Sequence, residues 1–192
     1  AEQLARFHSP PGFEIELVAA EPQIRKPINL KFDAQGRLLV TGSVEYPFPA
    51  ESGRQSGDKI QVLSDTNQDG HYDQVTTFAE RLNIPVGITP VPRGVLAYTV
   101  PNIELLQDTD GDGHADHRQV VFGPFGFADT HGMPNAFTWW IDDWIYACQG
   151  QGNVSRVAGT LGPPITMHGG TTFRLKADGS RIEAFAFGQV NP

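Results

Sequence analysis

Two nine-residue segments with the same acidic pattern constrain this chain more than any other feature. They read DTNQDGHYD at residues 65–73 and DTDGDGHAD at residues 108–116. Each places an oxygen-bearing side chain at positions 1, 3, 5 and 9 and a glycine at position 6. Like-charged carboxylates about 5 Å apart repel by roughly 3 kcal/mol per pair at an effective dielectric near 20. A loop of this kind therefore folds best around a cation.

Calcium is the cation that this pattern favours. Hard oxygen ligands and a glycine at the sharp turn suit Ca²⁺ better than Zn²⁺ or Mg²⁺, and the backbone carbonyl at position 7 adds a further ligand. We predict two structural calcium sites, the alternative being acidic Asx-turns without metal. The predicted ligands are Asp65, Asn67, Asp69, His71 and Asp73 in the first loop, and Asp108, Asp110, Asp112, His114 and Asp116 in the second.

The flanking sequence shows that these loops are not EF-hands. An EF-hand carries a bidentate glutamate at position 12 and a helix on each side. Position 12 is Thr76 in the first loop and Gln119 in the second. The flanking segments alternate or run apolar like short strands; they are residues 59–63, 75–78, 102–106 and 119–122. Each loop is therefore predicted to connect two strands.

The spacing between the loops predicts a β-propeller. Asp108 follows Asp65 by 43 residues, and a period of roughly 40 to 50 residues with several strands per unit is typical of propeller blades. Hairpin patterns support this fold, and they occur at residues 30–40, 86–98, 136–146 and 172–185. A β-sandwich or jelly roll is the alternative. At this period the chain holds about four blades or fewer, so we expect residues 1–192 to form a partial propeller domain, truncated at its C-terminus.

Composition narrows the class of partner. The formal net charge of −8 and the pI of about 5.1 argue against a nucleic-acid partner. No segment approaches 18 consecutive apolar residues, so no transmembrane segment is predicted. The single cysteine, Cys148, permits no internal disulfide. Helical periodicity is weak and is strongest in a turn at residues 2–7.

Several motifs occur together in an order that resembles a known family. They are PGFEIELV at 11–18, DAQGRL at 33–38, the two acidic loops, DTHGM at 129–133, Asn135, WIY at 144–146 and GQVNP at 188–192. This series resembles the N-terminal propeller of the planctomycete-type membrane-bound dehydrogenase proteins. Those proteins are similar to the soluble quinoprotein glucose and sorbosone dehydrogenases.

The resemblance implies a fold, a location and an activity. It implies a six-bladed propeller in the full protein, exported to the periplasm or the cell surface and often fused to a cytochrome c module. The implied activity is oxidation of a sugar or alcohol, with electrons passing to pyrroloquinoline quinone (PQQ) or to a haem partner. By the same resemblance, His131 is the general base that takes the hydroxyl proton. This chain departs from the family at Gln149, where a histidine is common.

Other interpretations of these residues stay open. His131 could instead be a hydrogen-bonded loop histidine that organises Asp129. The domain could be a non-catalytic, calcium-stabilised propeller that binds glycans or proteins, or an architectural part of a larger enzyme. Any exposed ring among Trp139, Trp140 and Trp144 would suit sugar stacking, whereas core packing is the more common fate of tryptophan. Asn153 begins a glycosylation sequon.

Overall fold

The structure is a computed structural model that describes residues 6–190. Most of the helical turn expected at residues 2–7 lies outside the described residues. Within the described part the chain contains strands and no α-helix. The strands are β1 (Pro27–Phe32), β2 (Leu38–Gly42), β3 (Asp58–Ser64), β4 (Gln74–Leu82), β5 (Ile88–Val91), β6 (Gly94–Thr99), β7 (Asn102–Gln107), β8 (His117–Phe122), β9 (Asn135–Trp139), β10 (Ile145–Gln149), β11 (Ser155–Val157), β12 (Ile165–Met167), β13 (Thr171–Leu175) and β14 (Ile182–Phe187).

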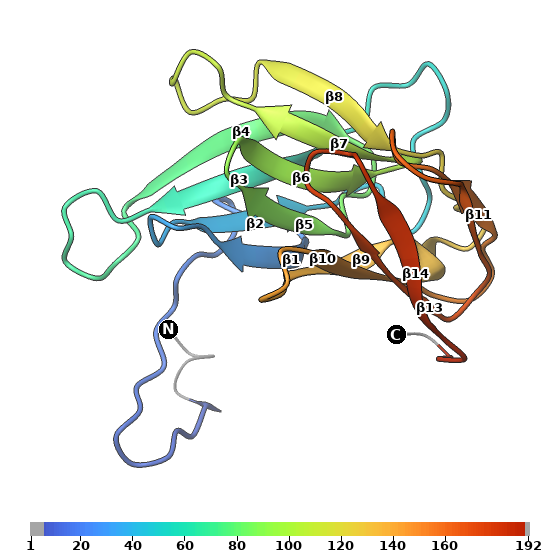
Figure 1. Cartoon of the computed structure of the whole chain (residues 1–192). Coiled ribbons are helices and arrows are strands. Elements are labelled where there is room, and N and C mark those ends of the chain that lie inside the picture. The colour runs from blue at the N-terminus through green and yellow to red at the C-terminus, as the bar shows by residue number, and fades with distance from the viewer. Residues whose placement is uncertain (1–5, 191–192) are drawn as a thin grey trace.

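The strands form three four-stranded antiparallel sheets (Figure 1). The first sheet has the order β1-β2-β3-β4, the second β5-β6-β7-β8 and the third β9-β10-β13-β14. A small hairpin, β11-β12, is inserted between the second and third strands of the third sheet. The predicted all-β class is therefore confirmed. All four predicted hairpins are present, as β1-β2, β5-β6, β9-β10 and β13-β14.

The turn between β1 and β2 shows how the sequence sets these hairpins locally. The carboxylate of Asp33 accepts hydrogen bonds from the backbone N–H groups of Gln35 and Arg37, each 2.9 Å long. Gly36 has a φ of 77°, in the left-handed region that glycine enters without steric cost. An aspartate followed by glycine thus ends one strand and starts the next.

The first strands of the three sheets lie next to one another, β1 against β5 and β5 against β9. Two side-chain hydrogen bonds join the sheets at these strands. Asn29 Nδ2 donates to the carbonyl oxygen of Val86 at 2.7 Å, and Trp139 Nε1 donates to that of Pro90 at 2.8 Å. Each sheet therefore presents its first strand to the first strand of the next.

Apolar side chains fill the spaces between the sheets. One buried cluster includes Ile60 of the first sheet and Ile88 and Leu106 of the second. The largest cluster joins the second and third sheets and includes Phe122 and Phe173. Full burial of such a side chain stabilises a fold by about 1.5–3 kcal/mol relative to exposure, so these two clusters hold the sheets face to face.

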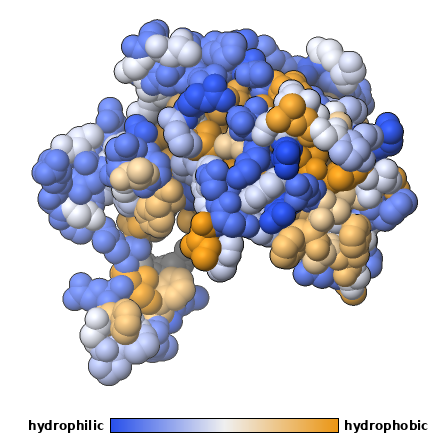
Figure 2. Space-filling model, viewed as in Figure 1, coloured by the Kyte–Doolittle hydropathy of each residue, from blue (hydrophilic) through white to orange (hydrophobic). Residues whose placement is uncertain are grey.

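Apolar side chains also remain exposed at both ends of the row of sheets. On β1, Leu30 and Phe32 are exposed, and on β14, Phe185 and Phe187 are exposed. Figure 2 shows hydrophobic residues on the same side of the molecule as β13 and β14. In the described part of the chain, no helix is long and apolar enough to cross a bilayer.

The phenol of Tyr98 is the one side-chain group within residues 6–190 that is buried without a hydrogen-bond partner, and its burial raises its pKa. A buried polar group without a partner costs about 1–3 kcal/mol. We expect Tyr98→Phe to raise the free energy of unfolding by about 1 kcal/mol, measured by urea denaturation.

Tyr146→Phe is the matched control, because its hydroxyl donates to Asp142 Oδ2 at 2.8 Å. That variant should lower the free energy of unfolding by about 0.5 kcal/mol, because it removes a hydrogen bond that the wild-type protein makes. Equal losses in the two variants would show that the Tyr98 hydroxyl is satisfied in solution.

Candidate functional site

The two acidic loops occupy the same place in two successive sheets. Residues 65–73 join β3 to β4, and residues 108–116 join β7 to β8. Figure 1 shows both loops at one end of the molecule, away from the long connection between β2 and β3. The predicted strands on both sides of each loop are confirmed, so the loops link antiparallel neighbours.

The two loops also share a backbone conformation. At position 4, Gln68 and Gly111 have φ values of 60° and 83°, and at position 6, Gly70 and Gly113 have values of 92° and 88°. The glycine at position 6 is evident from the sequence, whereas the left-handed residue at position 4 was not predicted. The signal was present only in the second loop, where position 4 is glycine.

Hydrogen bonds close both loops in the same way. The carboxylate at position 1 accepts the backbone N–H at position 6, from Gly70 to Asp65 at 2.8 Å and from Gly113 to Asp108 at 2.9 Å. In the second loop the bond from Gly113 stabilises the ionised form and is the main cause that lowers the pKa of Asp108. In each loop the position 1 side chain is therefore held by a backbone N–H group from the turn.

The aspartates at position 9 are engaged by the threonines at position 2. The Thr66 hydroxyl donates to Asp73 at 2.8 Å, and the Thr109 hydroxyl donates to Asp116 at 2.6 Å. The backbone N–H of the same threonine donates to the same carboxylate in each loop, at 3.0 Å. These bonds lower the pKa of both aspartates. Position 9 therefore holds the loop closed, and its carboxylate keeps lone pairs for a further ligand.

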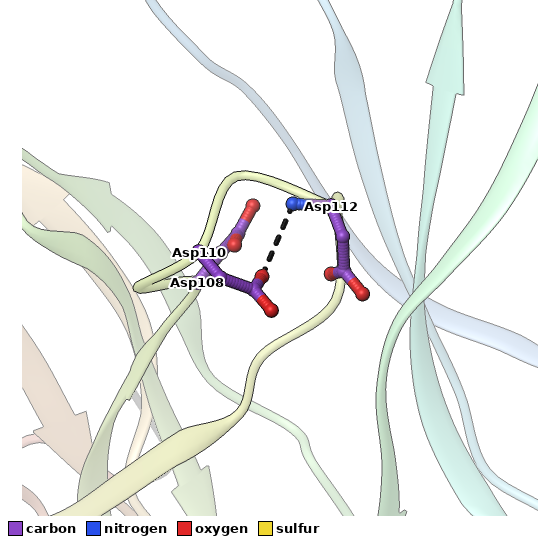
Figure 3. Close-up of side chains that lie close together, drawn as sticks. All are labelled: Asp108, Asp110 and Asp112. Carbon is purple, nitrogen blue, oxygen red and sulfur yellow. Dashed lines mark hydrogen bonds between the residues drawn. The ribbon is translucent and has the colours of Figure 1, made fainter.

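The second loop brings three carboxylates together. Oxygen atoms of Asp108, Asp110 and Asp112 all lie within 4.8 Å of one another (Figure 3). The backbone N–H of Asp112 donates to Asp110 Oδ1 at 3.3 Å. In the first loop, position 3 is Asn67, a neutral amide whose Oδ1 accepts the N–H of Asp69 at 3.0 Å. The second loop therefore concentrates more negative charge.

The surroundings of the two loops differ. In the second loop, the backbone N–H of Ala115 donates to the carbonyl oxygen of Phe78 in β4, at 2.6 Å, which ties the loop to the first sheet. Asp108 and Asp112 line a groove of about 1060 Å³ between the first two sheets. In the first loop, His71 contacts Glu16 of the N-terminal segment, and this carboxylate raises the pKa of His71.

His131 lies on a different set of loops, in a short 3-10 turn, η2 (Thr130–Gly132), that follows Asp129. Asp129 Oδ1 accepts the backbone N–H of His131 at 2.9 Å and lies 3.0 Å from Nδ1 of its ring. The bonds from the His131 backbone and ring lower the pKa of Asp129. The His131 side chain is 67% exposed, and within residues 6–190 its Nε2 has no hydrogen-bond partner.

Asn153 fixes the backbone of this turn. Its Oδ1 accepts the N–H of Asp129 at 3.0 Å, and its Nδ2 donates to the carbonyl oxygen of Asp129 at 2.7 Å. Asn153 is 2% exposed. Because both ends of the amide are used and buried, the sequon at Asn153 is a structural element in the folded chain and not a surface acceptor for glycan.

Gln149 belongs to the core. It is fully buried, accepts from the Ser155 hydroxyl and donates to the carbonyl oxygen of Asn153 at 3.2 Å. Gln149 therefore helps to hold Asn153 in position. Gln149, Ser155 and Asn153 thus form one buried hydrogen-bond network.

The three tryptophans have different surroundings. Trp139 packs against the core, and the Trp144 ring lies under Arg174 and Lys176, at 4.4 and 4.7 Å from the ring centroid. Trp140 is 61% exposed. Of the three, only Trp140 presents a ring that is open for stacking.

Tyr46 and Pro47, in the connection between β2 and β3, meet the His131 turn. The Tyr46 and His131 rings pack edge-on with centroids 5.7 Å apart, and Thr130 Oγ1 donates to the carbonyl oxygen of Pro47 at 2.8 Å. This connection enters β3 at Asp58, whereas the first acidic loop leaves β3 after Ser64. Seven residues of strand span about 20 Å, so the acidic loop and His131 lie at opposite ends of the sheets.

The structure defines an all-β protein of four-stranded antiparallel sheets with repeated acidic loops between strands. The chain belongs to the family described as "Domain of unknown function (DUF7133)", which matches residues 1–191. No curated protein and no solved structure matches the chain.

The difference at position 4 gives a direct test of the shared loop geometry. A left-handed conformation costs an L-residue other than glycine about 1–2 kcal/mol, while glycine costs about 0.5–1 kcal/mol more backbone entropy on folding. We expect Gln68→Gly to raise the free energy of unfolding by about 0.5–1 kcal/mol in a urea titration. Gln35→Gly is the control, because Gln35 is not among the positive-φ residues; a gain in that variant but not in Gln68→Gly would contradict the loop geometry.

Proposed function

We propose that this chain is part of a β-propeller in an exported, quinoprotein-dehydrogenase-like protein that oxidises a sugar or alcohol. In this proposal His131 is the general base, and the two acidic loops hold structural Ca²⁺ at the opposite end of the blades. The observation that carries the proposal is the geometry of His131: Nδ1 lies 3.0 Å from Asp129 Oδ1, the side chain is 67% exposed, and Nε2 has no hydrogen-bond partner among the described residues.

The arrangement of sheets supports the propeller. Three four-stranded sheets lie in sequence with their first strands adjacent, which is the radial order of propeller blades. The outer faces of the first and third sheets expose Phe32 and Phe187. Apolar residues at such positions would be covered by neighbouring blades in a closed ring.

The pairing of His131 with Asp129 suits proton abstraction. A carboxylate at Nδ1 holds the proton on that nitrogen, so that Nε2 carries the free lone pair. This nitrogen is accessible and can accept a proton from a substrate hydroxyl. Asp129 and the Tyr46 ring contact the histidine ring, and the buried Asn153 amide fixes the backbone of Asp129.

The described residues around His131 do not fit the carboxylates of PQQ. The polar groups that meet this turn are Asp129, Asn153 and Pro47, which are acidic or neutral. Arg54, in the neighbouring connection, is paired with Glu45. A bound quinone would accept hydride from the alcohol carbon, so we place its binding groups, or a haem partner in a cytochrome c module, outside the described residues and assign only proton transfer to this chain.

The acidic loops fit Ca²⁺ through their donor sets. Carboxylate and amide oxygens at positions 1, 3 and 5 are hard ligands, and the second loop already gathers three of them. Repulsion within this group, about 1–3 kcal/mol per pair depending on solvent screening, would be relieved by a divalent cation. The second loop has four aspartates and the first has three, so we expect tighter binding in the second.

A second candidate function is a non-catalytic propeller that binds glycans or proteins. Exposed apolar side chains in loops favour it, namely Phe48 at 80%, Trp140 at 61% and Ile141 at 94% exposure. Exposed aromatic rings are suited to stacking on sugars or partner side chains. Binding of glycans without turnover would favour this candidate over an oxidase or dehydrogenase activity.

The catalytic role of His131 is tested by dye reduction in the full-length protein supplied with PQQ, Ca²⁺ and a panel of aldoses and alcohols. We expect His131→Ala to lower kcat/KM by about 10²–10⁴, the usual contribution of a general base. His117→Ala is the control, since His117 lies in β8 and belongs to neither site. Full activity in the His131 variant would exclude it as the base.

The calcium sites are tested by titration and melting. We expect two Ca²⁺ ions per chain by calorimetry, with Asp69→Asn weakening one site and Asp112→Asn the other. Asp178→Asn, in the β13-β14 turn, should leave the stoichiometry at two. Binding at 100 times Kd stabilises by about 2.7 kcal/mol per site, so EGTA, which would empty both sites, should lower Tm by about 10–20 °C. An unchanged Tm would count against both loops.

A further inference from the structure

We propose that the buried carboxylate of Asp58 is a positioning residue for His131 and acts through Ser43 and Tyr46. The inference rests on the proposed role of His131 as a base, and it adds residues from another sheet to that site. None of the three contacts a substrate in this proposal. They determine how the imidazole is held.

Asp58 has an unusual position for an aspartate, because it begins β3 and is fully buried. A buried carboxylate is costly unless its oxygen atoms are hydrogen-bonded. Here four donors satisfy it: the Ser43 hydroxyl at 2.7 Å, and the backbone N–H groups of Val44 at 2.7 Å, Glu45 at 3.1 Å and Ile84 at 2.8 Å. Asp58 therefore ties the start of the β2-β3 connection to the segment that links the first two sheets.

Ser43 transmits this restraint to Tyr46. The Ser43 hydroxyl donates to Asp58 and accepts the backbone N–H of Tyr46 at 3.0 Å. With its proton directed to a carboxylate, the hydroxyl oxygen can only be an acceptor for Tyr46. The backbone of Tyr46 is thus linked to the buried carboxylate through two successive hydrogen bonds.

Tyr46 in turn restrains His131. The two rings pack edge-on at 5.7 Å with an interplanar angle of 77°. The next residue, Pro47, accepts a hydrogen bond from Thr130, the residue before His131. The β2-β3 connection therefore meets the His131 turn at two adjacent points: Tyr46 packs against His131, and Pro47 is hydrogen-bonded to Thr130.

The rest of the β2-β3 connection is fixed as well. Arg54 pairs with Glu45 through both carboxylate oxygens, and this contact is the main cause that lowers the pKa of Glu45 to about 2. Asn83 binds Ala50 through both its amide oxygen and its amide nitrogen. The connection is thus anchored at Glu45 and Ala50 as well as at Ser43.

An exposed histidine held only by Asp129 could rotate about its terminal torsion, which is broad for this residue type. The Tyr46 ring restricts that rotation. The imidazole then keeps Nδ1 at Asp129 and Nε2 outward, the arrangement that proton abstraction requires.

The test is ¹⁵N NMR of the His131 ring in the folded chain at about pH 8.5, where imidazole is mostly neutral. We expect the wild-type chain to show one tautomer, protonated at Nδ1. Tyr46→Ala and Ser43→Ala should give averaged shifts from both tautomers, whereas Tyr46→Phe should keep the wild-type spectrum because the ring is retained. Ser56→Ala is the matched control, since the Ser56 hydroxyl accepts the Asp58 backbone N–H and does not contact the carboxylate.

Wild-type ring shifts in both Ser43→Ala and Tyr46→Ala would overturn the proposal, and averaged shifts in Ser56→Ala would overturn it as well. Asp58→Asn is a further variant for the same measurement where it folds. An amide cannot accept all four hydrogen bonds, so this variant should also give averaged ring shifts. The spectra do not depend on turnover, so they separate this proposal from the proposed function. If His131 is the base, Ser43→Ala should also lower kcat about tenfold with KM unchanged. If His131→Ala retains full activity, the function fails while the ring shifts still report the positioning.

Discussion

The packing of both faces of the second sheet is the constraint on which the rest of the molecule depends. Apolar side chains of this sheet contact the first sheet on one side and the third on the other, through Leu106 and Phe122 respectively. Almost every residue of β6 is buried as a result. A polar side chain in the middle of such a strand loses its hydration, as the phenol of Tyr98 in β6 does without gaining a partner. The acidic loops and the His131 turn lie instead in connections at the strand ends.

Carboxylates are satisfied in different ways at the two ends of the sheets. At one end, the acidic loops keep their carboxylates near water and satisfy them with backbone N–H groups, such as that of Gly113 on Asp108. At the other end, Asp58 is removed from water entirely and organises several segments around its charge. The first arrangement suits an exchangeable cation, and the second suits a fixed support for a neighbouring side chain.

Local sequence predicted much of the fold. The hairpins were recognised from alternating apolar residues and from turn residues such as Asp33 and Gly36, whose hydrogen bonds lie within a few positions. The acidic loops were predicted with their flanking strands for the same reason. The left-handed conformation at Gln68 was not predicted, because glutamine has no intrinsic preference for it and only the equivalent Gly111 indicates it.

By itself the sequence determined the all-β class, the hairpins and the two acidic loops, since each rests on short-range periodicity or turn chemistry. It pointed to His131 as a base only through a resemblance. Only the tertiary structure decided what surrounds His131. Thr130 meets Pro47 across 83 residues, and Ile84 meets Asp58 across 26. It also placed Gln149 and Asn153 in a buried network. Such contacts depend on how separate sheets pack, and no local pattern of residues encodes them.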